Sequence, residues 1–194
     1  NFSRLWLSYW WNALEWQQSV DNYGGIGRYN LKNAWINDQV LAHCERRGIF
    51  LQMETLVHAS LKSDYGWPQH PYNVRNMGFL ADWRDYWRHP RVLALSDNQL
   101  SYLVARYADS PAIHSWNVMS EPDILGRDRW PQAKAHILDR LRFLRAMDPY
   151  GHIIGNQLCM ADRDPGFFRE PDVQFVSANA YAGGIAGLAE DQIP

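Results

Sequence analysis

The sequence has 194 residues, of which 46% are hydrophobic and 21% charged, and its formal net charge is −2. This balance is that of a folded globular chain and excludes a disordered or collagen-like one. The near-neutral charge offers no basic surface for a nucleic-acid backbone, and the longest apolar runs fall far short of the roughly 20 residues that cross a bilayer. We therefore expect neither a nucleic acid nor a membrane as a partner.

Cysteine and aromatic residues add two further expectations. Cys44 and Cys159 have no Cys or His neighbour at metal-ligand spacing, and no other His, Asp or Glu set has it, so we expect no metal and no cofactor. The 10 Trp, 10 Tyr and 7 Phe exceed the needs of one core, and many stand beside polar residues. Rings in such places often line a ligand surface.

The first third of the chain predicts a strand, a helix and a second strand. Phe2–Ser8 is short and apolar, and the Gly-rich stretch 21–28 after it predicts a loop. Asn30 is a helix N-cap candidate, and Gly48 stands where a helix would end. The apolar residues between them recur at helical spacing, and the apolar run Ile49–Val57 follows directly.

A long connection, 60–95, then separates this strand from the next helix. It is rich in Trp and Tyr, and loops of this length are often functional. Its rings could either stack on a ligand or pack over the helices. Ser96 and Gln99 form a capping box that predicts a helix beginning there and continuing to Tyr107. The rings in question are Trp67, Tyr72, Trp83, Tyr86 and Trp87.

The last part of the chain repeats the alternation of strands and helices. Ile113–Met119 is a strand candidate, and a helix begins near Pro131 and ends before Asp148. Two more strands are predicted at His152–Leu158 and Val173–Tyr181. Strands alternating with helices predict the α/β class, with a buried parallel sheet in one domain spanning 1–194.

A barrel is the favoured version of this architecture. No dinucleotide or Walker phosphate loop follows a strand, which argues against a nucleotide-binding sheet. Barrels place their chemistry at the carboxyl ends of their strands. The predicted strand ends carry Arg4 and Trp6, His58, Glu121, Asn156 and Gln157, and finally Asn179 and Tyr181.

Glu121 is the sharpest candidate among these side chains. A strand of bulky residues that ends in Glu-Pro would hold the carboxylate on a rigid base, and a partly desolvated Glu can donate a proton near neutral pH. A turn or capping role is about as probable from spacing alone. Arg4 could equally pair with a buried carboxylate, and His58 and Tyr181 could be packed and hydrogen-bonded structural residues.

The run Trp116–Pro122, WNVMSEP, resembles the fourth-strand motif of retaining glycoside hydrolases built on (β/α)8 TIM barrels. This is the cellulase and mannanase clan, of family 5 type, in which Asn-Glu-Pro is usual. Further similar stretches occur in the same order along most of the chain. They are Arg4-Leu5-Trp6, Gly27–Trp35, Tyr102–Tyr107 and Ser110-Pro111.

The resemblance implies a role for each matching residue. Glu121 falls on the general acid/base, Arg4 on an arginine that keeps the nucleophile ionised, His58 on a histidine that contacts sugar hydroxyls, and Tyr181 on a tyrosine beside the nucleophile. Trp6 is expected to contribute to the substrate surface. The chain would then run from barrel strand two to strand six, an incomplete barrel, and the nucleophile, a strand-seven Glu, would lie beyond Pro194.

Two residues depart from the pattern of the family. Ser120 replaces the asparagine that binds the sugar 2-hydroxyl, and Asn179 stands where His is more common. We keep both as substrate-binding candidates, and they leave open a barrel that binds carbohydrate without cleaving it. The resemblance implies a β-linked poly- or oligosaccharide as substrate and an extracellular or periplasmic location. The residues themselves indicate neither location nor oligomeric state.

Length agrees with an incomplete barrel, since about 250 residues are typical of a whole one. One carboxylate cannot perform a double displacement, so we predict that this chain by itself has no glycosidase activity.

Overall fold

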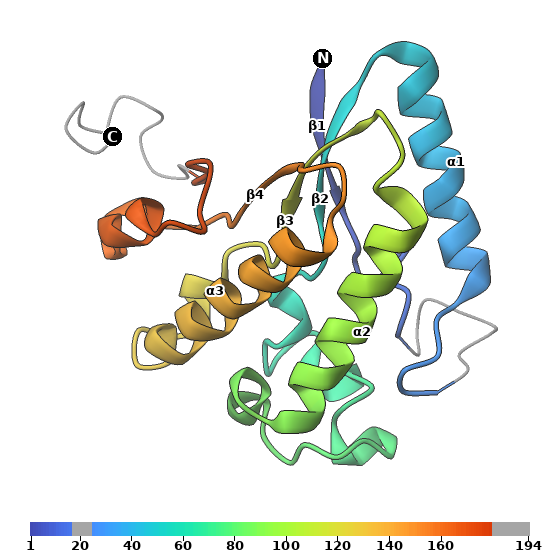
Figure 1. The fold of residues 1–194 in the computed structure, drawn as a ribbon. Helices are drawn as coiled ribbons and strands as arrows, with labels where there is room; N and C mark the ends of the chain where they lie inside the picture. Colours follow the sequence, from blue (N-terminus) through green and yellow to red (C-terminus); the bar gives the residue numbers. More distant parts are fainter. Residues whose placement is uncertain (17–24, 180–194) are drawn as a thin grey trace.

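The computed structural model describes residues 1–16 and 25–179. In this part of the chain, parallel strands alternate with helices (Figure 1). The strands are β1 (Phe2–Trp6), β2 (Phe50–Glu54), β3 (Ile113–Asn117) and β4 (Ile153–Gly155). The α-helices are α1 (Leu31–Arg47), α2 (Pro90–Tyr107) and α3 (Trp130–Met147). Short 3-10 helices are η1 (His58–Ser60), η2 (Trp67–Gln69), η3 (Val74–Asn76), η4 (Trp83–Trp87), η5 (Pro122–Leu125), η6 (Ala161–Arg163) and η7 (Pro165–Arg169).

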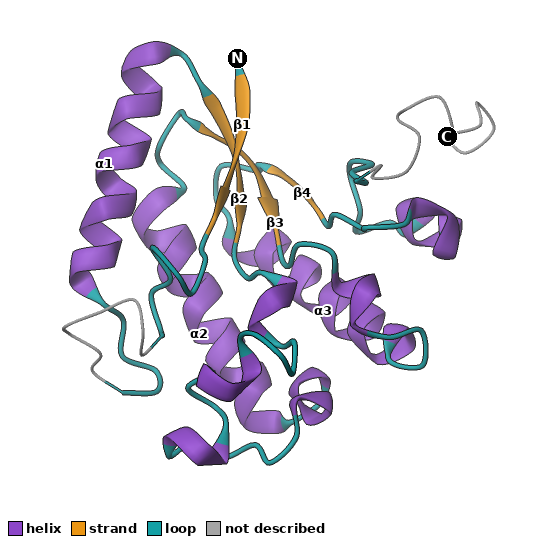
Figure 2. Cartoon of the chain, turned by 180° about the vertical axis from the view of Figure 1, so that it is seen from behind, coloured by secondary structure: helices purple, strands orange, loops and turns teal. Residues whose placement is uncertain are grey.

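The spatial order of the strands is β1-β2-β3-β4, the order of the chain. Because βαβ crossovers are right-handed, this order puts all three helices on one face of the sheet, as Figures 1 and 2 show. An ordered run of parallel strands with helices on the outer side is the wall of a (β/α)8 barrel. The predicted α/β class and the incomplete barrel are confirmed.

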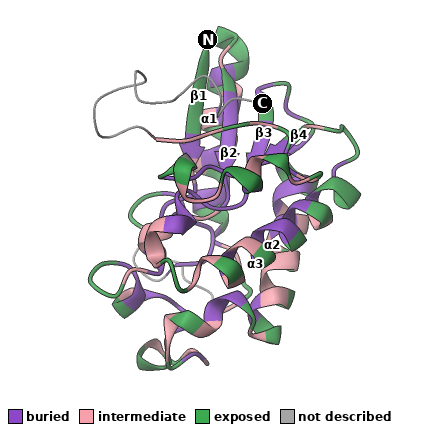
Figure 3. Ribbon diagram, turned by 90° about the vertical axis from the view of Figure 1, so that its left-hand side faces the viewer, coloured by how far each residue is buried: buried purple, intermediate pink, exposed green. Residues whose placement is uncertain are grey.

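The helix-facing side of the sheet holds the main core. Strand register aligns Leu5 with Met53, Met53 with Trp116, and Trp116 with Ile154. These four side chains are at most 5% exposed and belong to one cluster with buried residues of the helices. In Figure 3 the strands β2 and β3 are accordingly coloured mostly as buried.

The opposite side of the sheet is polar, although much of it is buried. Trp6, Glu54 and Asn117 share one rank of the register. Two residues earlier on their strands, Arg4 and Gln52 share another. Successive side chains on a strand point to opposite faces, so these polar residues all face the inside of the barrel wall. This face leads directly to the candidate site.

The ends of α1 confirm the predicted caps. The Asn30 side chain accepts hydrogen bonds from the backbone N–H groups of Lys32 and Asn33. Gly48 adopts the left-handed conformation, with φ of 62°, which a glycine adopts without the penalty of a side chain. The strand β2 can therefore begin at Phe50, two residues later.

The predicted start of the next helix is wrong. α2 begins at Pro90, and Ser96 lies inside it. His89 is the N-cap, and its side chain accepts a hydrogen bond from the Arg91 backbone. Proline suits the first helical turn, where its missing N–H leaves no bond unmade, so it outcompetes the later capping box. The predicted helix up to Tyr107 is confirmed, and its residues Leu100, Leu103, Val104 and Tyr107 are buried.

The predicted strand Val173–Tyr181 is not formed in its described part. Residues 173–179 make a single isolated bridge to the end of the sheet, Leu158 with Ala178. One reason lies at Gln174, whose backbone N–H donates to the Ile154 carbonyl while its side-chain oxygen accepts from the Ile154 N–H. The Gln174 side chain thus binds the Ile154 N–H group, which the backbone carbonyl of a neighbouring strand would otherwise bind. Tyr181 lies outside the described residues.

The aromatic residues of the long connection pack as a second core. Trp67, Tyr72, Tyr86 and Trp87 are at most 8% exposed and cluster with Met119 from the segment after β3. Trp83 is partly buried against the same cluster. These rings therefore pack against the fold and do not form a stacking surface for a ligand.

Candidate active site

Glu121 lies just beyond the carboxyl end of β3 and is only 3% exposed. Its backbone is left-handed, with φ of 48° and ψ of 46°. This conformation costs a non-glycine residue about 1–3 kcal/mol and persists only where the surroundings enforce it. Pro122 begins η5 immediately afterwards and fixes the direction in which the chain leaves. Such strain at a buried carboxylate is typical of a functional site.

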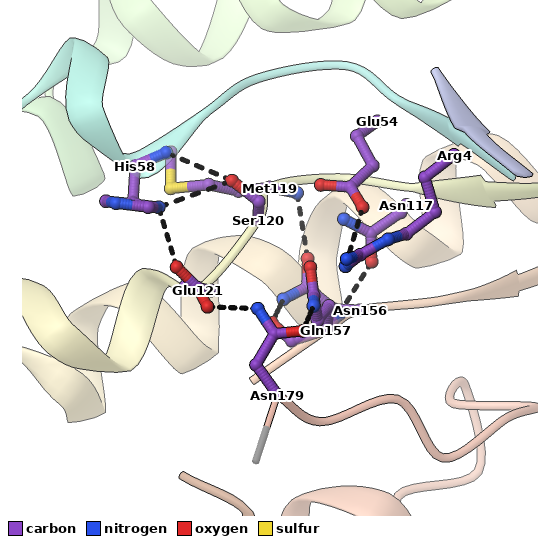
Figure 4. A network of polar contacts seen from close by, with 10 residues as sticks. All are labelled: Arg4, Glu54, His58, Asn117, Met119, Ser120, Glu121, Asn156, Gln157 and Asn179. Atoms are coloured by element: carbon purple, nitrogen blue, oxygen red, sulfur yellow. Dashed lines mark hydrogen bonds and ion pairs between the residues drawn. The ribbon is translucent and has the colours of Figure 1, made fainter. Parts of the chain in front are cut away.

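Two side chains from distant parts of the chain meet the Glu121 carboxylate (Figure 4). His58 Nδ1 lies 3.4 Å from Oε2, and Asn179 Nδ2 donates a hydrogen bond to Oε1. The strand ends therefore bring together three of the residues that the sequence analysis selected. The carboxylate faces this cluster and not bulk solvent.

His58 begins η1, four residues after β2 ends. Burial lowers the pKa of its imidazole, although the adjacent Glu121 acts in the opposite direction. A neutral imidazole has one donor and one acceptor nitrogen, so it can exchange hydrogen bonds with a carboxyl group or with hydroxyl groups.

Ser120 is completely buried behind His58. Its Oγ lies 3.4 Å from both the backbone nitrogen and Nδ1 of His58. These two contacts restrict the orientation of the His58 ring.

A set of amides connects the ends of β3 and β4. Asn179 Oδ1 accepts a hydrogen bond of 2.6 Å from Gln157 Nε2. The Gln157 backbone donates to Asn117 Oδ1 at 2.6 Å, and the Met119 backbone donates to Asn156 Oδ1 at 2.8 Å. A chain of hydrogen-bonded amides therefore runs from Asn117 through Gln157 and Asn179 to the Glu121 carboxylate, as Figure 4 shows.

Arg4 in the middle of β1 and Trp6 at its end have adjacent side chains. The Arg4 guanidinium carbon is 5.8 Å from the centre of the Trp6 ring, and Arg4 Nη1 is 3.6 Å from Oε1 of Glu54. The Arg4 side chain remains 35% exposed, whereas that of Glu54 is 0% exposed. Burial raises the pKa of Glu54 to about 7, against the lowering effect of Arg4.

Glu54 was not predicted, because on its strand the sequence analysis selected only His58, which follows the apolar run Ile49–Val57. The signal was present in the run FLQMETL, where Gln52 and Glu54 alternate with apolar residues. That alternation puts both side chains on the polar inner face.

Asp123 is a second residue that the sequence analysis did not select. Its two carboxylate oxygens accept hydrogen bonds from the backbones of Cys159 and Met160, at 2.8 and 2.9 Å. It thereby ties η5 to the segment that follows β4. The Cys159 thiol is buried close to Glu121 and Asp123, and burial together with these carboxylates raises its pKa to about 11. Cys159 lies four residues after the end of β4.

Two other classes of site are absent from the described residues. None of the helices in 1–16 and 25–179 is both long and apolar enough to cross a membrane. No group of three or more His, Cys, Asp or Glu side chains in the same ranges could hold a metal ion.

Comparison with known proteins was informative only at the level of structure. No sequence-family model and no curated protein matches the chain. A glycoside hydrolase family 5 mannosidase from Rhizomucor miehei matches 93% of the chain with a TM-score of 0.65 and 12% identity. An endo-1,4-β-D-mannanase from Thermotoga petrophila matches 80% with a TM-score of 0.53 and 15% identity. Endo-glycoceramidase II from Rhodococcus sp. matches 82% with a TM-score of 0.55 and 13% identity.

These matches cover 48%, 46% and 42% of the respective solved chains. The chain thus spans about half the length of the structures that it resembles. At such low identity the likeness concerns the fold. The resemblance inferred from the WNVMSEP motif is confirmed at that level: the chain has the fold of about half of a TIM-barrel glycosidase.

Proposed function

We propose that this chain carries the acid/base half of a retaining glycosidase site that acts on β-linked poly- or oligosaccharides. The observation that carries the proposal is the Glu121 carboxylate, buried at a strained position beyond β3 and held by His58 and Asn179. The barrel-wall fold supports it, because barrels place their chemistry at these strand ends. The mannosidase and mannanase structures that share the fold favour a mannan or a related glycan over a nucleotide or phosphate ester.

In this proposal Glu121 acts twice. It first gives its proton to the glycosidic oxygen while a second carboxylate attacks the anomeric carbon and the glycosidic bond breaks. It then takes a proton from the water that displaces the enzyme carboxylate from that carbon. His58 and Asn179 hold the Glu121 carboxyl group, and the exposed donors of Arg4 face sugar oxygens.

The second carboxylate has to come from elsewhere in the barrel. Glu54 lies on the same face, but a side chain with 0% exposure cannot reach an anomeric carbon. The family resemblance assigns the nucleophile to a Glu on a seventh strand.

A barrel that binds carbohydrate without cleaving it is the second candidate. Ser120 favours it, because its hydroxyl is buried against His58 and does not reach a bound sugar. The interaction with the 2-hydroxyl that supports the transition state would then be lost.

Hydrolysis with an added carboxylate separates the two candidates. We expect the isolated chain to release no phenol from phenyl β-mannoside or phenyl β-glucoside, whose poor leaving group needs a proton from the acid/base residue. With sodium formate as a substitute nucleophile, an acid/base site gives slow turnover that Glu121→Gln abolishes. Binding of mannohexaose or cellohexaose without formate-dependent turnover would support the binding barrel. Absence of both binding and turnover would refute a carbohydrate site.

A further inference from the structure

Glu54 is a buried ionisable group that the proposed reaction does not use. It ends β2 with 0% exposure, and neither of its oxygens has a hydrogen-bond donor among the described residues. A carboxylate in such a place is costly, because burial removes its hydration and no hydrogen bond replaces it. A neutral residue of similar size would stabilise the fold better. The groups that contact Glu54 must therefore account for its charge.

The charged group that contacts Glu54 is Arg4. The distance from Arg4 Nη1 to Glu54 Oε1 is 3.6 Å, and the guanidinium carbon is 5.8 Å from the Trp6 ring centre. Trp6 and Glu54 are direct partners in the register of β1 and β2. The guanidinium is therefore flanked by a carboxylate and an aromatic ring, which restricts a side chain that otherwise has many rotamers.

Among the other neighbours of Glu54, the Trp6 side chain also favours its ionised form. Gln52 and Asn117, which share its face, are neutral, and neither of their buried amide nitrogens donates a hydrogen bond to Glu54. The other charged group that acts on Glu54 is Glu121, which has the same sign and opposes its ionisation. Among the described residues, Arg4 is thus the cation that stabilises an ionised Glu54, with the Trp6 side chain acting in the same direction.

We propose that Glu54 is a positioning residue that fixes the Arg4 guanidinium against Trp6, so that the exposed N–H groups of Arg4 point to oxygen atoms of a bound β-linked sugar. This inference rests on the proposed function for its ligand, but the orientation of Arg4 can be tested without one. Glu54 acts through Arg4, because it is itself inaccessible to a ligand. Since burial raises the pKa of Glu54 to about 7, the arrangement is complete above neutral pH and weakens below it.

The first experiment observes Arg4 directly in the whole chain. We expect the Arg4 side-chain ¹H–¹⁵N signals to shift between pH 6 and pH 8 in the wild type and to stay constant in Glu54→Gln. The variant is nearly isosteric, so it removes the charge and leaves the packing. Exposed Asp64→Asn serves as the control and is expected to behave like the wild type. Equal pH responses in wild type and Glu54→Gln would overturn the proposal.

The second experiment measures binding of mannohexaose and cellohexaose by calorimetry at pH 8. We expect Glu54→Gln to weaken binding about tenfold, the size of one charge-assisted contact. In an Arg4→Ala background, the same substitution should have no further effect, because Glu54 acts only through Arg4. Additive losses in this cycle would show a general structural role and contradict the proposal. If neither sugar binds the wild type, the carbohydrate site is refuted, and the Arg4 signals alone decide whether Glu54 orients Arg4.

Discussion

Asn179 Nδ2 donates a hydrogen bond to Oε1 of Glu121, although the two residues are 58 positions apart in the chain. The same amide accepts a hydrogen bond from Gln157 with its oxygen, so its orientation is determined from both ends. An amide nitrogen cannot accept a hydrogen bond, and its partner oxygen on Glu121 must therefore be an acceptor. This contact connects the segment after β4 to the candidate acid/base.

Asn179→Asp replaces the donor by a second carboxylate beside Glu121. Two neighbouring carboxylates repel each other when ionised, so we expect a loss of about 1–3 kcal/mol in unfolding free energy at pH 7. The loss should shrink at pH 3, where carboxyl groups are protonated. Urea denaturation at both pH values measures it, with Gln39→Glu on the exposed side of α1 as control. A loss that is equal at pH 3 and pH 7 would argue against charge repulsion.

Glu15 predicts a pH dependence of stability. Its oxygens accept hydrogen bonds from the Gly27 backbone and the Tyr72 hydroxyl, yet burial raises its pKa from 4.5 to about 7. The folded state therefore binds more protons than the unfolded state between these values, and stability from this group falls as pH rises through that window.

Comparison with Glu15→Gln isolates this contribution. Relative to the variant, we expect the wild type to lose up to roughly 3 kcal/mol between pH 4.5 and pH 7. Chemical denaturation across this range gives the difference, and Asp64→Asn, an exposed change, should show none. Parallel stability curves for wild type and Glu15→Gln would disprove the prediction.

Trp116→Phe tests the centre of the main core. Trp116 is 0% exposed, and its indole nitrogen donates to Asp148 Oδ2 at 3.0 Å. The substitution leaves a cavity and removes a donor from a buried carboxylate, which should cost about 2–4 kcal/mol. Urea denaturation monitored by circular dichroism measures the cost. Trp35→Phe on the exposed side of α1 should cost under about 0.5 kcal/mol, and similar losses for both would contradict the assigned packing.

Gly78→Ala tests a close approach in the connection between β2 and α2. A β-carbon at Gly78 would lie 2.1 Å from the carbonyl carbon of Tyr72, so the backbone would have to move. We expect a loss of roughly 3 kcal/mol, in the range of severe packing changes. Gly166→Ala, whose β-carbon would meet only a side-chain oxygen at 3.2 Å, should cost under about 1 kcal/mol. A thermal unfolding midpoint equal in both variants would rule out the steric argument.

Local patterns in the sequence were sufficient for the secondary structure of most of the chain. Asn30 and Gly48 mark the ends of α1 because capping depends on bonds within a few residues. The pattern erred at Ser96 and at Val173–Tyr181, where competing interactions of Pro90 and Gln174 decide the outcome. Glu121 could be selected from its place after an apolar strand.

Only the tertiary structure decided how the selected residues meet. Whether the loop aromatics pack or stand exposed depends on what covers them, and Tyr72 and Trp87 are covered. The contact of Asn179 with Glu121 and the burial of Glu54 under Arg4 depend on strand register and on segments far apart in the chain. A residue pattern encodes hydrophobic spacing and caps over short distances, whereas desolvation and charge pairing arise only when distant segments share one interior.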